Sequence, residues 1–164
     1  MNNTVISIVL LSTIGLCLSC QKEPAVADFI HLGVEMRITT HDEIDLLDPQ
    51  YPEAITAGDI TVYHIVNGEK IKQYYPNSEI APGHFRIHQP TPANGLPFYV
   101  LQVFISDHVE NSGLSKTIIE YLGRTPDTIE ARIHHGIASI FYTDLWLNGH
   151  KVNLPEEHVV VIKE

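Results

Sequence analysis

The sequence contains very little cysteine. Of its 164 residues, only Cys17 and Cys20 are cysteines, and the 144 residues from 21 to 164 contain none. A domain formed by residues 21–164 therefore has no disulfide, no cysteine-ligated zinc ion and no cysteine nucleophile. Its stability must come from a packed core, and a chain of this length is long enough to form one.

Positive charge is also scarce. Ten Lys and Arg residues stand against twenty Asp and Glu, which gives a formal net charge of −10, and the basic residues form no run. An acidic surface repels the phosphate backbone of nucleic acids and anionic lipid headgroups alike. We therefore expect no nucleic-acid partner.

No hydrophobic run is long enough to span a membrane. The main apolar segment, Val5–Leu18, has 14 residues, and a helix of that size is about 21 Å long, against roughly 30 Å for the hydrocarbon core of a bilayer. Ser19 then precedes Cys20, and polar residues follow at once. The pattern predicts a lipoprotein signal peptide over residues 1–19, with lipid attached to the thiol of Cys20.

The match to the bacterial lipobox is imperfect, because Leu18 and Cys17 stand where Ala or Ser and Leu are usual. An ordinary secretory signal that is cleaved nearby is the alternative. In the lipoprotein interpretation, acyl chains on Cys20 anchor the protein to the membrane. Residues 20–31 then form the lipidated N-terminus and tether, and residues 32–164 form a single domain.

From Leu32 onward, apolar and polar residues alternate in short segments, and no long segment has a helical period. This pattern is typical of β-strands that are half buried. It predicts an all-β fold, an immunoglobulin-like antiparallel β-sandwich of about eight or nine strands. The predicted strand and hairpin ranges are Gly33–Thr40, Ile60–Tyr75, Phe98–Ile105, Thr117–Leu122, Thr128–Ile133, Ser139–Leu154 and His158–Lys163. In the first range Val34, Met36 and Ile38 share the face predicted to be buried. Phe98–Ile105 is apolar on both faces, which predicts an inner strand of a covered sheet, and the four successive apolar residues of Val159–Ile162 predict a buried strand.

Two of these ranges are hairpins that turn on Asn-Gly, at Asn67-Gly68 and at Asn148-Gly149. This dipeptide tolerates the positive φ angles of a type I′ turn. Pairing of Val66 with Glu69 would fix the register of the first hairpin. The core face would then carry Ile60, Val62, His64, Ile71 and Tyr75.

Pairing of Leu147 with His150 would fix the second hairpin. The core face would then carry Phe141, Leu145, Leu147 and Val152, and the outer face would carry Tyr142, Asp144, Trp146 and Lys151. Exposed aromatic rings beside an acid and an amine would form a stacking platform for a sugar ring or a peptide. The alternative is that Trp146 packs in the core.

The loop between the first two predicted elements offers the best metal candidates, because calcium takes oxygen ligands from irregular loops. These candidates are Asp42, Asp45 and Asp48. Their spacing matches no EF-hand, and Asp at a turn usually bonds its own backbone. His84 and His88 would lie about 13 Å apart in a strand, too far apart to share one ion. We predict no metal site and no cofactor.

The sequence contains neither a nucleophile elbow nor a glycine-rich phosphate loop. We therefore predict that the protein is not an enzyme, with a metal-dependent hydrolase as the less favoured alternative.

Several short segments together resemble a known group. They are Ser19-Cys20, Asp45-Leu46-Leu47-Asp48-Pro49, Asn67-Gly68, Asp127-Thr128-Ile129 and Trp146-Leu147-Asn148-Gly149. The combination is similar to the small uncharacterised outer-membrane lipoproteins of Bacteroidota, and the resemblance implies an envelope location. The segment Cys20-Gln21-Lys22-Glu23 is also similar to the surface-export signal of that group, with Pro24 in place of a second acid. Both the cell surface and the periplasmic face of the outer membrane stay open.

The sequence thus predicts an outer-membrane lipoprotein, anchored through Cys20, that acts as a non-catalytic binding or accessory module for a glycan or an envelope protein. One alternative is a structural subunit of a cell-envelope assembly. The other is a calcium-stabilised or metal-dependent hydrolytic domain.

Overall fold

The computed structural model describes residues 29–79, 81–92, 95–153 and 158–164. These residues form eleven strands in two sheets, together with a short 3₁₀ turn, Ala57–Asp59. The strands are β1 (Phe29–His31), β2 (Gly33–Thr39), β3 (Ile60–Val66), β4 (Glu69–Lys72), β5 (Phe85–His88), β6 (Val100–Phe104), β7 (Ser115–Tyr121), β8 (Arg124–His135), β9 (Ser139–Leu147), β10 (His150–Lys151) and β11 (Val159–Ile162). The predicted all-β class is confirmed, and the two sheets are consistent with a β-sandwich.

Among the residues described, none belongs to a helix with the length and apolar character needed to cross a membrane. The predicted signal peptide, Cys20 and most of the tether lie outside the described residues.

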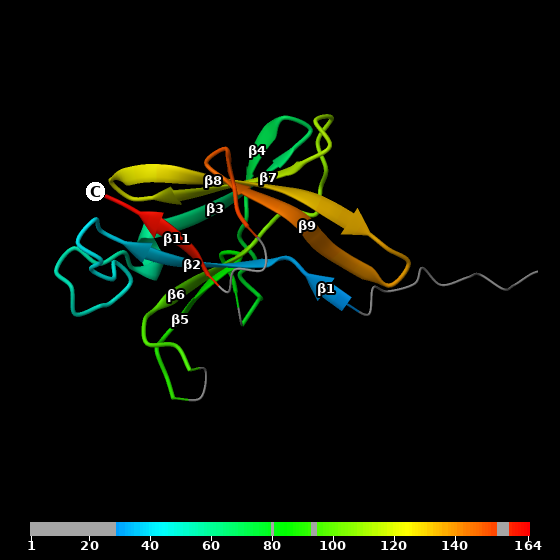
Figure 1. Ribbon diagram of the computed structural model, residues 1–164. Helices are drawn as coiled ribbons and strands as arrows, with labels where there is room; N and C mark the ends of the chain where they lie inside the picture. The colour runs from blue at the N-terminus through cyan, green and yellow to red at the C-terminus, as the bar shows by residue number, and fades with distance from the viewer. Residues whose placement is uncertain (1–28, 80, 93–94, 154–157) are drawn as a thin grey trace, which may run out of the picture.

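The strands divide unequally between the two sheets (Figure 1). The larger sheet has the order β1-β9-β8-β7-β3-β4, with β10 also paired to β9, and the smaller sheet has the order β11-β2-β6-β5. Strand β6 is an inner strand of the smaller sheet, as the apolar residues on both faces of Phe98–Ile105 predicted, although Gln102 interrupts them.

The prediction of purely antiparallel sheets is wrong, because both sheets are mixed. Strand β1 runs parallel to β9, and β11 runs parallel to β2. Neither pair is joined by a hairpin, so no tight turn forces the two strands to run in opposite directions. Strand β1 also falls within the range assigned to the tether, so the described sheet starts at residue 29, three residues before the predicted domain boundary.

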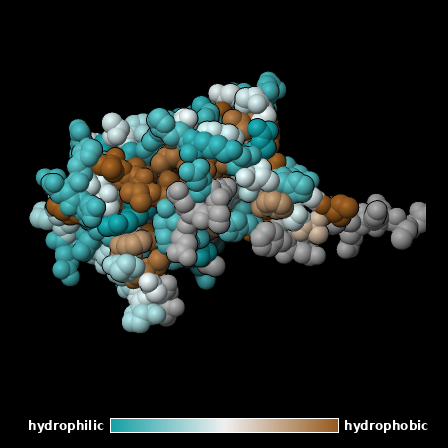
Figure 2. All heavy atoms as spheres, in the orientation of Figure 1, coloured by the Kyte–Doolittle hydropathy of each residue, from teal (hydrophilic) through white to brown (hydrophobic). Residues whose placement is uncertain are grey.

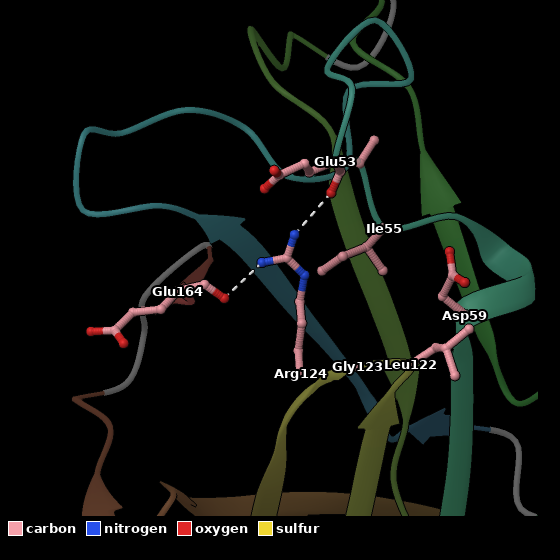
Figure 3. Close-up of a pocket in the computed structure, with 8 residues that line it drawn as sticks. Glu53, Ile55, Asp59, Leu122, Gly123, Arg124 and Glu164 are labelled. Carbon is pink, nitrogen blue, oxygen red and sulfur yellow. Dashed lines mark hydrogen bonds between the residues drawn. The ribbon is translucent and has the colours of Figure 1, made fainter.

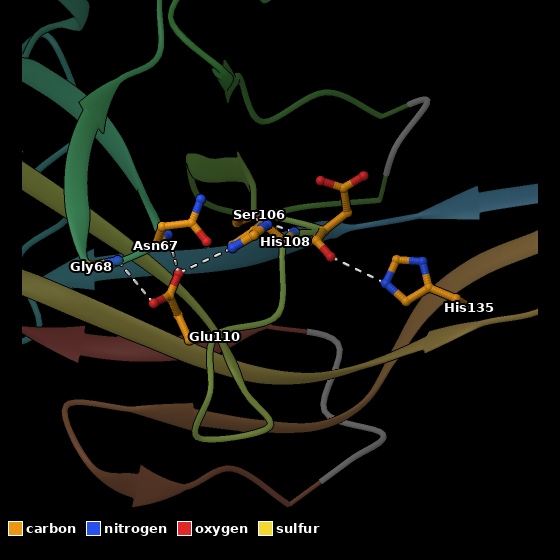
Figure 4. Close-up of polar contacts among 7 residues, drawn as sticks. Asn67, Gly68, Ser106, His108, Glu110 and His135 are labelled. Atoms are coloured by element: carbon orange, nitrogen blue, oxygen red, sulfur yellow. Dashed lines mark hydrogen bonds and ion pairs between the residues drawn. The ribbon is translucent and has the colours of Figure 1, made fainter.

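The two Asn-Gly hairpins have the predicted registers, with Val66 opposite Glu69 and Leu147 opposite His150. Both turn residues have positive φ in each hairpin, as a type I′ turn requires. In the first hairpin, the carboxylate of Glu110 accepts hydrogen bonds from the main-chain N–H groups of Asn67 and Gly68, at 2.8 and 3.0 Å (Figure 4). The hairpin between β7 and β8 has a shorter turn than predicted, because β8 begins already at Arg124.

The core lies between the two sheets. Strand β2 contributes Val34, Met36 and Ile38, the three residues that its alternating sequence predicted to be buried. The opposing apolar side chains of the larger sheet are Val62, Ile119, Ile129, Ala131 and Leu145. Burial of this continuous apolar surface is the main stabilising contribution in a domain without disulfides.

Some apolar residues predicted to be buried are exposed. Ile71 is 42% exposed on β4, an edge strand of the larger sheet, and Tyr75, in the loop after β4, is 51% exposed. In β11, Val160 and Ile162 are 55% and 53% exposed, whereas Val159 and Val161 face the core. Figure 2 shows hydrophobic atoms gathered on the face where β11 lies in Figure 1. The apolar run in β11 thus belongs to a strand with one covered face, not two.

Candidate ligand-binding pocket

The hairpin of β9 and β10 brings together three of the four residues predicted to form a platform. Lys151 lies opposite Trp146, and its Nζ atom is 2.7 Å from Oδ1 of Asp144 and 5.6 Å from the centroid of the Trp146 ring. Nε of Arg132 lies 3.3 Å from Oδ2 of the same carboxylate. The hydrogen bond from Lys151, together with the charges of both basic residues, lowers the pKa of the Asp144 carboxyl.

Tyr142 does not join this group. A β-bulge in β9 leaves Thr143 without a partner in β8, so Arg132 pairs with Asp144 but the next residue, Ile133, pairs with Tyr142. An extra residue reverses which face the following side chains occupy. Tyr142 therefore packs against the core, and its hydroxyl donates to the main-chain oxygen of Gly33 at 3.4 Å. Burial and the negative charge of nearby Glu35 raise its pKa.

Lysine side chains already cover aromatic rings in both hairpins. Lys151 lies over Trp146, and Lys70 lies over Tyr63 with its Nζ atom 4.1 Å from the ring centroid. Each lysine also forms an ion pair with an acidic residue, Lys151 with Asp144 on the adjacent strand β9 and Lys70 with Glu120 on β7, two strands away from β4. A sugar that stacked on the covered face of either ring would first have to displace a paired lysine.

Two of the three calcium candidates, Asp45 and Asp48, already accept hydrogen bonds from main-chain N–H groups. Oδ1 of Asp45 accepts from the N–H of Leu47, and its Oδ2 accepts from the N–H of Tyr99, both at 2.9 Å. Oδ1 of Asp48 accepts from the N–H of Gln50 at 2.9 Å, and Asp42 is exposed. These bonds link the loop to its surroundings. Within the described ranges, no three His, Cys, Asp or Glu side chains are grouped closely enough to hold a metal ion.

A cavity of about 420 Å³ lies beside Arg124 (Figure 3). The guanidinium donates from Nη1 to the main-chain oxygen of Glu164 at 2.8 Å and from Nη2 to that of Glu53 at 2.9 Å. Two nitrogen atoms of the Arg124 guanidinium therefore already donate hydrogen bonds to main-chain oxygens of the protein. The lining also includes three acidic residues, Glu53, Asp59 and Glu164, which disfavour an anionic ligand.

A second cavity, of about 400 Å³, has a mainly apolar lining. It lies where β1, β3, the end of β6 and the loop between β4 and β5 meet, so four segments distant in sequence form it. We name it the histidine pocket. Its lining residues are Ile30, Leu32, His64, Tyr75, Ser78, Ala81, His84, Phe104, Ile105 and Asp107. A concave, mainly apolar site of this size with a few polar groups is the usual form of a small-molecule site.

Four rings pack together at this pocket. The His84 ring stacks on Tyr75 with centroids 4.9 Å apart, and it meets His64 edge-on at 5.1 Å and Phe104 at 6.3 Å. His84 has a φ of 61°, in the left-handed region that few residues other than glycine adopt. Main-chain bonds hold it there: its N–H donates to Ala81 at 3.0 Å, and its carbonyl accepts from Phe104 at 2.9 Å.

Both imidazoles of the pocket are kept neutral. Burial is the largest effect on the pKa of His64 and of His84 and lowers both, while the nearby carbonyl of Phe104 and the charge of Asp107 raise them less. Nε2 of His64 lies 3.1 Å from that carbonyl oxygen. Nδ1 of His84 is buried and has no hydrogen-bond partner among the described residues. The pocket thus places two neutral imidazoles beside apolar surface.

Sequence reasoning did not find this pocket. It placed His64 and Tyr75 on the core face of one hairpin, and it considered His84 only as a metal ligand with His88. One feature of the sequence does indicate a polar contact in this region, namely the placement of His64 at a core position. A buried polar side chain needs a hydrogen-bond partner. The partners come from residues 20 to 40 positions further along the chain.

Comparisons of the chain with protein-family models, with curated proteins and with solved structures find no match. The geometry of the pocket and of the two hairpins therefore carries the functional argument.

Proposed function

We propose that the protein is an outer-membrane lipoprotein, anchored through Cys20, whose β-sandwich binds a small ligand in the histidine pocket. The observation that carries this proposal is the mainly apolar cavity of about 400 Å³ whose lining brings together the rings of His64, His84 and Tyr75. A concave apolar site with a few polar groups is the form in which proteins bind small molecules.

The proposed role is binding, not catalysis. A histidine that acts as a general base is usually oriented by a hydrogen bond from a second side chain. Within the described part of the chain, the imidazoles of His64 and His84 contact rings and a main-chain carbonyl, and neither bonds a hydroxyl or carboxylate. Neutral imidazoles held in this way orient a ligand by hydrogen bonding.

The pocket replaces the aromatic platform as the favoured site, because a paired lysine covers one face of Trp146 whereas the pocket is open. Glycan binding through Trp146 stays a prediction, as does the immunoglobulin-like assignment of the sandwich. The periplasmic face of the outer membrane and the cell surface are both compatible with a binding module.

Imidazole resonances provide a direct test of the pocket. We expect a library of small polar and aromatic compounds to contain ligands that shift the ring signals of His64 and His84 in the full chain. The signals of exposed His41 and His150 serve as the internal control and should not move. A library in which no compound moves the two pocket signals selectively would contradict the proposal.

The lipid anchor is tested separately. Cys20→Ala should abolish incorporation of labelled palmitate and release the protein from the membrane fraction, because acylation needs that thiol. Cys17→Ala is the matched control and should keep both lipid and membrane attachment. Equal palmitate incorporation in the two variants would contradict anchoring at Cys20.

A structural subunit of an envelope assembly is the second candidate, and the exposed Val160 and Ile162 of β11 favour it. Strand β11 lies at the edge of the smaller sheet, where an added strand could pair with it. It has only four residues, however, and a short edge strand gives limited pairing. Mild cross-linking in intact cells should give a stable partner product if this role holds, and Val160→Lys should remove that product.

A further inference from the structure

The acidic residue at the histidine pocket is Asp107. It is exposed, and among the described residues its carboxylate forms no hydrogen bond or ion pair, whereas its main-chain oxygen lies 3.2 Å from Nε2 of His135 (Figure 4). The preceding residue is fixed too, because the N–H of Ser106 donates to Oγ1 of Thr117 at 2.9 Å. The fold therefore holds the backbone of Asp107 in place and leaves its carboxylate available.

The rest of the lining carries no formal positive charge. Its described residues include no Lys or Arg, and both imidazoles are neutral. The guanidinium of Arg86, which is not part of the lining, lies over the Phe104 ring at 5.4 Å. Aromatic ring faces attract cations, and the chain as a whole has a net charge of −10. Both the local and the overall charge favour a cation.

We propose that the histidine pocket selects a small organic ammonium ion with an apolar body, whose charge pairs with Asp107 and whose body packs against Leu32, Tyr75 and Ile105. This inference rests on the proposed function, since it names the ligand class of the same pocket. A cavity of about 400 Å³ accommodates a ligand of this kind, such as an arylalkylamine.

Acidification should weaken this binding. The His64 ring lies near His84, Asp107 and the main-chain carbonyl of Phe104. The His84 ring lies near His64, Tyr75, Asp107 and the same carbonyl. Protonation of either imidazole would place a positive charge beside the bound ammonium. Burial lowers the pKa of both from 6.5, so we expect affinity to be constant above about pH 6.5 and to fall as the pH is lowered further.

The test is calorimetric titration of the full chain in detergent with three ligands of similar shape. These are 2-phenylethylamine, the neutral 2-phenylethanol and the anionic 3-phenylpropanoate. We expect the amine to bind at least about fivefold more tightly than the alcohol, as an exposed charge pair allows, and the anion to bind most weakly. Asp107→Asn should remove the preference of the amine over the alcohol.

Asp42→Asn is the matched control, because Asp42 is an exposed acid outside the pocket lining, and it should leave the preference intact. Equal binding of amine and alcohol by the native protein would overturn the ammonium assignment and leave the pocket as a binding site. Binding of none of the three ligands overturns the ammonium assignment also, and the imidazole library screen then decides whether the pocket binds any ligand. Because Asp107 is exposed, its replacement is not expected to unfold the protein.

Discussion

The Nζ atom of Lys163 lies 2.6 Å from Oδ1 of Asp127, and both side chains are almost completely buried. Asp127 belongs to β8 in the larger sheet, and Lys163 directly follows β11 in the smaller sheet, so this ion pair joins the two layers. Lys163 also donates to the main-chain oxygen of Thr125 at 2.9 Å, and Nδ2 of Asn148 donates to the same carboxylate oxygen at 2.9 Å. These extra bonds offset part of the desolvation cost of the two charges.

Removal of one partner of this pair should be strongly destabilising. Asp127→Ala leaves the Lys163 ammonium buried without a counter-charge, so we expect a loss of about 3–5 kcal/mol in the free energy of unfolding. Urea denaturation of the variant measures it. The double variant Asp127→Ala with Lys163→Met should lose less than Asp127→Ala alone, because no buried charge is left unpaired.

The exposed pair of Lys116 and Glu130 is the matched control. Its Nζ–Oε1 distance is 3.1 Å, but both side chains are partly exposed. Lys116→Ala should therefore cost less than about 1 kcal/mol. Equal losses of unfolding free energy in Asp127→Ala and Lys116→Ala would show that burial does not make the pair of Asp127 and Lys163 more costly to break.

The stability of the protein should fall as the pH is lowered through the ordinary pKa of histidine. Burial holds the pKa of His64 and His84 below 6.5 in the folded state, so below that pH the unfolded chain binds more protons than the folded one. The contribution of the two buried imidazoles to stability is therefore fully present above pH 6.5. It decreases as the pH falls from that value towards the lower folded-state pKa. Thermal unfolding across this range measures the slope.

His84→Asn should reduce this slope, because it removes one of the two buried imidazoles. Asn tolerates the positive φ of this position better than most residues. His41→Asn, which replaces an exposed histidine, should leave the slope unchanged. Identical slopes in the native protein and in His84→Asn would exclude His84 as a source of the pH dependence.

The hairpin registers could be predicted from the sequence because the signal is local. An Asn-Gly dipeptide between alternating segments specifies a two-residue turn, and the turn then decides which residues face each other. The same logic placed Asp144, Trp146 and Lys151 together. It failed for Tyr142, because the bulge at Thr143 depends on how β9 fits against β8 and has no marker in the sequence of β9 alone.

The histidine pocket and the parallel strand pairs could not be predicted in this way. They depend on where distant segments meet, as when β1 pairs with β9 across more than one hundred residues, for example Ile30 opposite Ile140. Alternation within one segment says which face is apolar but not which strand lies alongside. For the same reason, the four apolar residues of β11 predicted a buried strand, whereas its position at a sheet edge leaves Val160 and Ile162 exposed.

The lysine over Trp146 should limit access to that ring. Trp146 is the single tryptophan of the chain, so its fluorescence reports on this position alone. Lys151→Ala removes the ammonium from the ring face and should increase quenching by acrylamide, with a stability loss of about 1 kcal/mol or less. Lys70→Ala uncovers Tyr63 in the other hairpin and should leave tryptophan quenching unchanged. Unchanged quenching in Lys151→Ala would mean that the lysine does not cover the indole in solution.

The two Asn-Gly turns should respond differently to loss of the asparagine side chain. Asn67 and Asn148 both have positive φ, 53° and 50°, so replacement by Ala costs a similar backbone strain at each. Asn148 makes two further bonds: its Oδ1 accepts from the N–H of Thr128 at 2.8 Å, and its Nδ2 donates to buried Asp127 at 2.9 Å. The turn at Asn67 is instead held through main-chain bonds to Glu110, which the substitution leaves in place.

Asn148→Ala should therefore lower the free energy of unfolding by about 1–3 kcal/mol more than Asn67→Ala, since a bond to a buried carboxylate is lost only in the first variant. Urea denaturation of the two variants measures the difference. The variant Asn148→Asp separates the two bonds: it keeps an acceptor for the N–H of Thr128 and places a second carboxylate beside Asp127. It should thus be less stable than the native protein even though the Thr128 bond survives. Equal losses in Asn148→Ala and Asn67→Ala would mean that the side-chain bonds of Asn148 contribute nothing beyond the turn itself.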